Sequence, residues 1–168
     1  MKWLLVVVGL LVVVVGVKAF LTMRGPSDDV LVKQALDEAI KASKEGRPGG
    51  VMDYLSDSLT INAESPTRRK IADFIKQSHP EIQVQNSEPV IRESEGTAQI
   101  NSPVHIKLTM PLGGSTVERT IPNVTLRFQR EDAREWLIIP TRQWRLKEVT
   151  VPAESVPADL ISGFGGGF

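Results

Sequence analysis

The side chains that could perform chemistry in this chain are few and scattered. Cysteine is absent, and the chain has one tyrosine, Tyr54, and two histidines, His79 and His105. The lack of cysteine excludes disulfides, thiolate metal sites and a thiol nucleophile. The sequence contains no P-loop, no dinucleotide fingerprint and no Gly-x-Ser-x-Gly motif. Two isolated histidines form no metal-binding pattern, so we expect neither a metal nor a cofactor.

A proton-transfer site could still be assembled from Asp53 as general base, with Tyr54 or Arg119 as an electrostatic helper. Asp53 and Tyr54 are consecutive, so on a helix they point about 100° apart and cannot both face one pocket fully. We expect His79 at a helix C-terminus and His105 on the solvated face of a strand. These observations favour a non-catalytic protein, and the Asp53 site remains the enzymatic alternative.

A ligand-binding site could involve the stretch REWLIIPTRQWRL, in which Trp136 and Trp144 lie eight residues apart. Core packing is the interpretation we favour for both tryptophans. The alternative is that Trp136, Trp144 and Tyr54 line the mouth of a curved sheet. Pro140 cannot donate to a central strand ladder, so we expect the strand to bend, bulge or lie at an edge there.

Helical elements occupy the first half of the chain after residue 25. Apolar residues recur there at helical spacing, namely Val32, Leu36, Ala39 and Ile40. They predict a helix with Ser27 as N-cap, which ends at Gly46. A short helix is expected from 51 to 56, followed by an irregular or extended exit. A third helix is expected with Ser65 as cap and Pro66 in its first position, and it ends at Pro80.

Strands follow after residue 81, where the hydrophobic period changes to two. Residues 97–110 alternate most cleanly, which predicts an antiparallel sheet covered on one face. The sequence predicts turns at 111–115 (PLGGS) and 130–135 (REDARE). Between them the parity switches at Pro122-Asn123, from Val117, Arg119 and Ile121 to Val124, Leu126 and Phe128, which predicts a bulge.

Basic residues crowd the last two strands and alternate with apolar ones, so we expect them on the outer sheet face. Acidic residues are interspersed among them, which indicates cross-strand ion pairs. The alternative is a surface for a protein partner or an anionic lipid. The basic residues are Arg127, Arg130, Arg134, Arg142, Arg145 and Lys147.

The N-terminal segment is unlike the rest of the chain. Residues 3–17 carry no charge, and with Lys18 allowed the apolar stretch reaches residue 23. A helix of this length spans roughly 30 Å, the thickness of the hydrocarbon core of a membrane. We therefore expect residues 1–24 to be a single-pass membrane anchor, with the following domain outside the cytoplasm. The alternative is a cleaved signal peptide.

The remainder divides into one domain at 25–152 and a glycine-rich tail at 153–168, which we expect to be flexible.

All 20 acidic residues lie after residue 24, together with 17 of the 20 basic ones, because Lys2, Lys18 and Arg24 precede them. The domain and tail thus have a net charge of −3, and a mildly acidic domain lacks the positive field needed for nucleic acid.

The order of elements resembles the nuclear transport factor 2-like superfamily, which includes SnoaL-like proteins and is also called the cystatin-like α+β cone. The resemblance rests on the segments DDVLVKQALDEAIKA, VMDYLSDSLTI, TRRKIADFI and VTLRFQREDAREWLII. It implies helices on the concave face of a bent antiparallel sheet, with room for a pocket. Family members include isomerases, dehydratases, polyketide cyclases and non-catalytic interaction domains, and homodimerisation through the sheet is plausible by the same resemblance.

Together these features predict a membrane-anchored, non-catalytic binding or assembly domain of α+β class. Its expected partners are membrane lipid at residues 3–23 and a second copy or another membrane protein. The first alternative is an isomerase, dehydratase or cyclase that uses Asp53. The second is a secreted ligand carrier from which the N-terminal segment has been removed.

Overall fold

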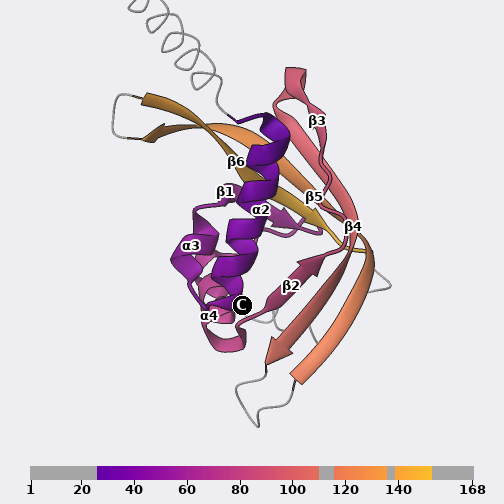
Figure 1. Cartoon of the computed structure of the whole chain (residues 1–168). Helices are drawn as coiled ribbons and strands as arrows, with labels where there is room; N and C mark the ends of the chain where they lie inside the picture. Colours follow the sequence, from indigo (N-terminus) through magenta and orange to yellow (C-terminus); the bar gives the residue numbers. More distant parts are fainter. Residues whose placement is uncertain (1–25, 110–115, 136–138, 153–168) are drawn as a thin grey trace, which may run out of the picture.

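The computed structural model describes residues 26–109, 116–135 and 139–152 (Figure 1). The predicted membrane span at 3–23, the turn at 111–115, the side chain of Trp136 and the tail at 153–168 lie outside these residues. Within the described part, no helix is long and apolar enough to cross a bilayer.

The fold is α+β, as predicted, with the helices on one side of a strongly bent sheet (Figure 1). The sheet has six strands in the order β1-β6-β5-β4-β2, and β3 pairs with β4. The helices are α2 (Asp28–Lys44), α3 (Pro48–Met52) and α4 (Arg68–Ser78), with a 3₁₀ turn η1 (Glu93–Glu95). The strands are β1 (Leu55–Ile61), β2 (Glu81–Val84), β3 (Val90–Arg92), β4 (Thr97–Thr109), β5 (Thr116–Glu135) and β6 (Ile139–Thr150).

The sheet is mixed, so the expectation of a purely antiparallel sheet is wrong at one edge. Strand β1 runs parallel to β6, with Leu55 opposite Leu146 and Ile61 opposite Val149. Parallel neighbours need a long crossover connection, and here α4 and the other strands lie between β1 and β6 in the sequence. Residues 55 and 56, expected at the end of the helix, instead begin an edge strand, and the exit after them takes the extended form of the two alternatives, irregular or extended.

Helix boundaries differ from expectation at the end of α3 and at the start of α4. The short helix α3 ends at Met52 instead of continuing to residue 56. Helix α4 begins at Arg68, and the cap is Thr67, whose Oγ1 accepts from the Lys70 N–H at 3.3 Å. Ser65 precedes this cap because the chain first closes a tight turn at Ile61–Glu64.

The other helix termini agree with those predicted from the sequence. Ser27 occupies the N-cap position of α2, although its hydroxyl makes no capping hydrogen bond. Gly46 follows the end of α2 with a φ of +65°, a conformation that favours glycine. His79 is the C-cap of α4, as expected.

The hairpin of β5 and β6 is longer than the sequence indicated. The charged stretch 130–135 continues strand β5, and Glu135 pairs with Ile139, so the predicted turn at 130–135 is wrong. A charged stretch is typical of a turn, but the backbone pairing with β6 continues through it. Pro140 pairs with Arg134 in β5, whereas β1 pairs with β6 only from Leu146 onward. Pro140 therefore lies at an edge.

The bulge predicted at Pro122-Asn123 is confirmed. Ser102 pairs with Val124 and Val104 with Ile121, so two residues of β5 lie opposite one residue of β4. Asn123 has a φ of +56°, a left-handed conformation that asparagine tolerates better than most residues. The bulge reverses which side of β5 faces inward and bends the sheet at this point.

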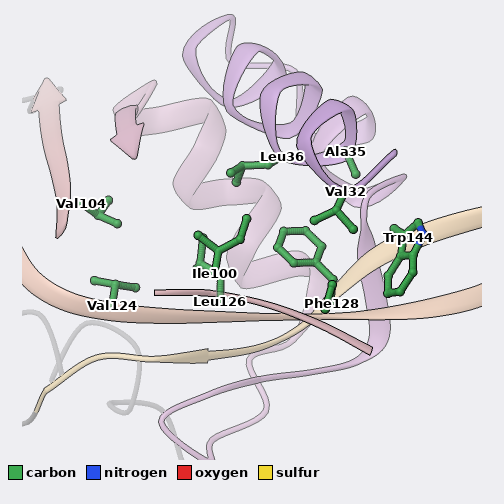
Figure 2. Close-up of a cluster of buried hydrophobic side chains, with 10 residues drawn as sticks. Val32, Ala35, Leu36, Ile100, Val104, Val124, Leu126, Phe128 and Trp144 are labelled. Carbon is green, nitrogen blue, oxygen red and sulfur yellow. The ribbon is translucent and has the colours of Figure 1, made fainter. Parts of the chain in front are cut away.

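The main core lies between α2 and the concave face of the sheet (Figure 2). The alternation predicted for β4 is confirmed, because Ala98, Ile100, Ser102, Val104 and Leu108 are all buried. A second cluster joins the end of α2 to α3, β1 and α4. The first cluster contains Val32, Ala35, Leu36, Ala98, Ile100, Val104, Val124, Leu126, Phe128 and Trp144, and the second Ala42, Val51, Leu55, Leu59 and Ile75.

The bulge geometry can be tested by substitution at Asn123. Asn123→Val should lower the free energy of unfolding by at least ~1 kcal/mol more than Asn123→Gly, because a β-branched residue is strained at positive φ. Urea denaturation of the two variants measures the difference. Equal losses would show that the positive φ is not kept in solution.

Candidate functional site

The concave face of the sheet is the place where this fold can form a pocket, and in the described residues apolar side chains fill it. Val32 and Leu36 of α2 pack against Ile100, Leu126 and Phe128 of β4 and β5 (Figure 2). Phe128 and Trp144 are each 1% exposed. An interior of this kind offers mainly packing contacts.

A carboxylate reaches the edge of this region from the first turn of α2, where Asp28 lies. Its Oδ1 accepts a hydrogen bond from Trp144 Nε1 at 3.1 Å, and its Oδ2 lies 3.7 Å from Arg130 Nη1. The Asp28 side chain is 14% exposed. A carboxylate in the first helical turn is favoured by the helix dipole, and a buried indole N–H needs an acceptor. Asp28 therefore connects α2 to β5 and β6.

This cluster was not predicted from the sequence, because its members lie far apart along the chain. Trp144 was favoured for the core, with the mouth of the curved sheet as the alternative. Arg130 was expected on the outer sheet face, which is wrong. It pairs with Trp144 in the strand register, and residues directly opposite in an antiparallel pair share a face, so Arg130 lies on the helix side.

The structure does not bring the proposed catalytic residues together. Asp53 is exposed, and its backbone carbonyl accepts from Gln143 Nε2 at 2.9 Å. Tyr54 is half-buried against the main core, and its carbonyl accepts from the Leu146 N–H. Leu146 pairs with Phe128, which lies nine positions from the exposed Arg119 on β5. Nine strand residues span roughly 30 Å.

The surroundings of Tyr54 change the pKa of its phenol. Burial raises the pKa of the Tyr54 phenol above its ordinary value, and the negative charges of Glu38 and Asp53 raise it further. The phenol therefore stays neutral to higher pH than a solvated tyrosine. A neutral hydroxyl can donate a hydrogen bond, but it is a poor base.

The three proposed ligand-binding residues do not form a single group in the described structure. Trp144 belongs to the core, as favoured, and is too buried to line a mouth. Trp136 lies outside the described residues. Tyr54 alone reaches the surface of the domain from the edge of the core.

The outer face of the sheet carries the predicted cross-strand ion pairs. Arg127 pairs with Glu148 at 3.1 Å, and Lys107 pairs with Glu118 at 3.2 Å. Exposed pairs of this kind contribute little to stability, so their main effect is to keep the surface polar and electrically balanced.

One part of the outer face is more enclosed. Glu131 accepts from Ser56 Oγ at 2.7 Å and from Arg145 Nη1 at 3.2 Å. The described residues include no group of three or more histidines and acids able to hold a metal ion. This cluster is therefore an ion pair with a serine donor, and it holds β1 against β6 and β5.

Comparison with known proteins identifies the fold. No family model matches the sequence, and the search of curated proteins finds no match. Among solved structures, a conserved protein from Planctomyces limnophilus aligns with a TM-score of 0.55 and 16% identity, over 73% of this chain and 93% of that one.

Two further solved structures carry the family description. An NTF2-like protein from Cytophaga hutchinsonii has a TM-score of 0.55 and 13% identity, over 74% of this chain and 97% of that one. A nuclear transport factor 2-like superfamily protein from Salmonella enterica has a TM-score of 0.52 and 16% identity, over 82% of this chain and 97% of that one. The domain therefore has the NTF2-like fold that the sequence resembled. Fold alone does not define an activity.

The role of Asp28 as an acceptor can be separated from its charge. Asp28→Ala should lower the free energy of unfolding by about 1–3 kcal/mol, because it leaves the buried indole N–H of Trp144 without an acceptor. Asp28→Asn keeps an acceptor oxygen and loses only a partly exposed ion pair, so its loss should stay below about 1 kcal/mol. Urea denaturation followed by tryptophan fluorescence gives both values, and equal losses would contradict the hydrogen-bond role.

The environment of Tyr54 can be measured directly because it is the only tyrosine in the chain. Its near-ultraviolet titration should show a pKa above that of a solvated tyrosine, and Glu38→Gln should lower it only partly, since burial is the main cause. The pKa of Tyr54 is higher in the folded protein than in the unfolded chain, so the neutral phenol contributes to the free energy of unfolding. This contribution is fully present below the unfolded pKa of about 10, and it is lost as the pH rises through the pKa of the folded protein. Asp37→Asn is the matched control, and an unshifted titration would contradict the burial of the phenol.

Proposed function

We propose that this chain is a membrane-anchored, non-catalytic binding or assembly domain of NTF2-like type. In this proposal residues 3–23 cross the membrane once and the domain lies outside the cytoplasm. The outer face of strands β4, β5 and β6 then contacts a second copy or another membrane protein.

The observation that carries the non-catalytic part is the packed concave interior. Val32 and Leu36 occupy the position above Phe128 where a substrate would need space. The buried hydroxyl on the concave face of β4, Ser102 Oγ, accepts from the Asn86 N–H at 2.8 Å and donates to the Pro103 carbonyl at 2.9 Å. Asp53, the base of the enzymatic alternative, is exposed.

The outer sheet face supports the binding part. Its described side chains bond to one another across the strands and leave a polar, uncovered surface. Asn101 Oδ1 accepts from both Gln99 and Thr125, and His105 Nδ1 lies 3.0 Å from Thr120 Oγ1. Such a surface offers hydrogen-bonding groups to a protein partner, while its balanced charges are unsuited to nucleic acid.

The position of α2 supports attachment close to the membrane. Only residues 24–27 separate the proposed span from Asp28, which is tied to β5 and β6. Val30, in the first turns of α2, is 47% exposed, and Val90, in β3, is 65% exposed. Because α2 and β3 are in contact, these two apolar side chains belong to the end of the domain that the anchor would hold near lipid.

The proposal is tested by photocrosslinking of the full chain in its native membrane. A photoreactive amino acid at Gln99, on the outer face, should crosslink to a partner or a second copy. The matched control is the same substitution at Gln34, an exposed position on α2, which should give no specific adduct.

The chain should also stay in the membrane fraction after alkaline washing, with its N-terminal peptide detectable by mass spectrometry.

The two readouts fail independently. Recovery in the soluble fraction without residues 1–24 would overturn the anchor and favour the secreted carrier. Adducts at Gln34 instead of Gln99, or at neither position, would overturn the outer face as the binding surface while leaving membrane attachment intact.

A further inference from the structure

Part of strand β5 lies at an edge of the sheet. From Thr125 onward β5 runs between β4 and β6, and Thr125 pairs with Thr150 of β6. Residues 116–121 of β5 pair with β4 and, among the described strands, with no other (Figure 1). The side chains from Thr116 to Thr120 are all exposed. A strand edge of this kind presents a row of backbone groups that can pair with another chain. We call residues 116–121 the β5 edge.

The hydrogen bonds of β4 show which backbone groups of the β5 edge point away from the sheet. The Pro103 carbonyl of β4 accepts from the Gln85 N–H at 3.1 Å, on the side where β2 lies. Backbone groups alternate between the two sides of a strand. Those of Ile106, three positions further along β4, therefore point toward β5. Ile106 pairs with Arg119, so the backbone groups of Arg119 belong to the ladder with β4.

The residues on either side of Arg119 direct their backbone groups away from β4. These residues are Glu118 and Thr120, and each has one donor and one acceptor. Pro122, two positions further along β5, has the same direction and no N–H to donate. Proline is confined to edge strands and bulges because it cannot donate to a ladder, so its position agrees with this assignment. The β5 edge thus offers hydrogen-bonding groups to an added strand.

The side chains of the β5 edge carry opposite charges on opposite faces of the sheet. Glu118 lies on the outer face, where it pairs with Lys107 at 3.2 Å. Arg119 lies on the concave face opposite Ile106, and it is exposed. Val117 shares the concave face and is 45% exposed. An added strand therefore meets a negative side chain on one face and a positive and an apolar side chain on the other.

A second copy of the chain does not complement this edge. In a symmetric antiparallel pair the same face of both copies lies on the same side, and outward-pointing residues pair with outward-pointing ones. The two registers with the most pairs are then centred on Glu118 or on Arg119. Each sets the central residue against its own counterpart, and like charges directly opposite are destabilising. The charges thus act against self-association and favour a strand of different sequence.

We propose that the β5 edge binds an extended segment of another protein by strand addition. The segment has an acidic residue opposite Arg119, an apolar residue opposite Val117 and a basic residue opposite Glu118. Its backbone bonds to the outward groups of Glu118 and Thr120, and its charges set the register. The proposal does not depend on the membrane anchor or on the outer face as a binding surface, because the added strand lies at the margin of the sheet.

A cyclic hairpin peptide is a suitable probe because its strand is already extended. Its outer strand reads Val-Thr-Glu-Lys-Val-Thr, which in an antiparallel pair places the glutamate opposite Arg119 and the lysine opposite Glu118. The control hairpin exchanges the glutamate and the lysine and so keeps the same composition. In an NMR titration of the full chain in detergent micelles, the probe should bind at least about fivefold more tightly than the control, because two attractive pairs replace two repulsive ones.

A backbone control separates strand addition from contact between side chains alone. Methyl groups on the two backbone nitrogens of the probe that face Glu118 and Thr120 remove its donors and leave its side chains unchanged. Binding of the methylated hairpin should be lost. Undiminished binding of the methylated hairpin, equal binding of probe and control, or binding of neither would overturn the proposal.

Arg119→Glu is the matched variant of the protein. It should remove most of the preference between the two hairpins, because each peptide then forms one attractive and one repulsive pair. Since Arg119 is exposed, the thermal midpoint should stay nearly unchanged, which separates loss of recognition from loss of folding. A preference that survives this substitution in full would overturn the assignment of Arg119.

Amide hydrogen exchange of the full chain without the probe shows whether the edge is open. The Glu118 and Thr120 amides should exchange at least about tenfold faster than the Arg119 amide, and addition of the probe should slow them. Slow exchange without the probe would overturn the proposal. Protection that persists on dilution would assign the edge to another part of the same chain, and protection lost on dilution would assign it to a second copy.

Discussion

The packing of α2 against one face of a bent sheet is the constraint on which the rest of this structure depends. Val32 and Leu36 meet Ile100, Leu126 and Phe128 there. Each large apolar side chain contributes about 1.5–3 kcal/mol when fully buried. The same contact requires the sheet to curve around the helix, and it fixes which residues of each strand face inward. The positions of the polar clusters follow from it.

The bend divides the sheet into two parts that differ in how they are covered. At Pro122-Asn123 an extra residue turns β5 and reverses its inward side. On the Phe128 side of the bulge the concave face packs against α2, whereas on the other side Val117 and Arg119 of the same face are exposed. One irregularity in one strand therefore sets which side chains of β5 enter the core.

The closed core also decides where function can reside. A substrate-binding cavity in this fold needs space and a polar group on the concave face, and here helix and strand side chains occupy that space. Asp28 enters the region but is committed to Trp144 and Arg130. The described residues also present a polar outer face and an end that carries the exposed Val30 and Val90, and these surfaces support the proposed binding role.

The sequence by itself determined the features that depend on neighbours along the chain. The alternation of β4, the glycine end of α2 and the bulge at Asn123 are local, because side-chain period, backbone conformation and parity are set within a few residues. Tertiary structure decided the rest. Whether 55–61 becomes a strand depends on pairing with β6, far along the chain. Likewise, Arg130 faces inward because β5 continues through the charged stretch beside β6 and meets Asp28 of the first described helix. No local pattern contains those partners, so only the folded chain could reveal the Asp28 cluster and the positions of Asp53, Tyr54 and Arg119 relative to one another.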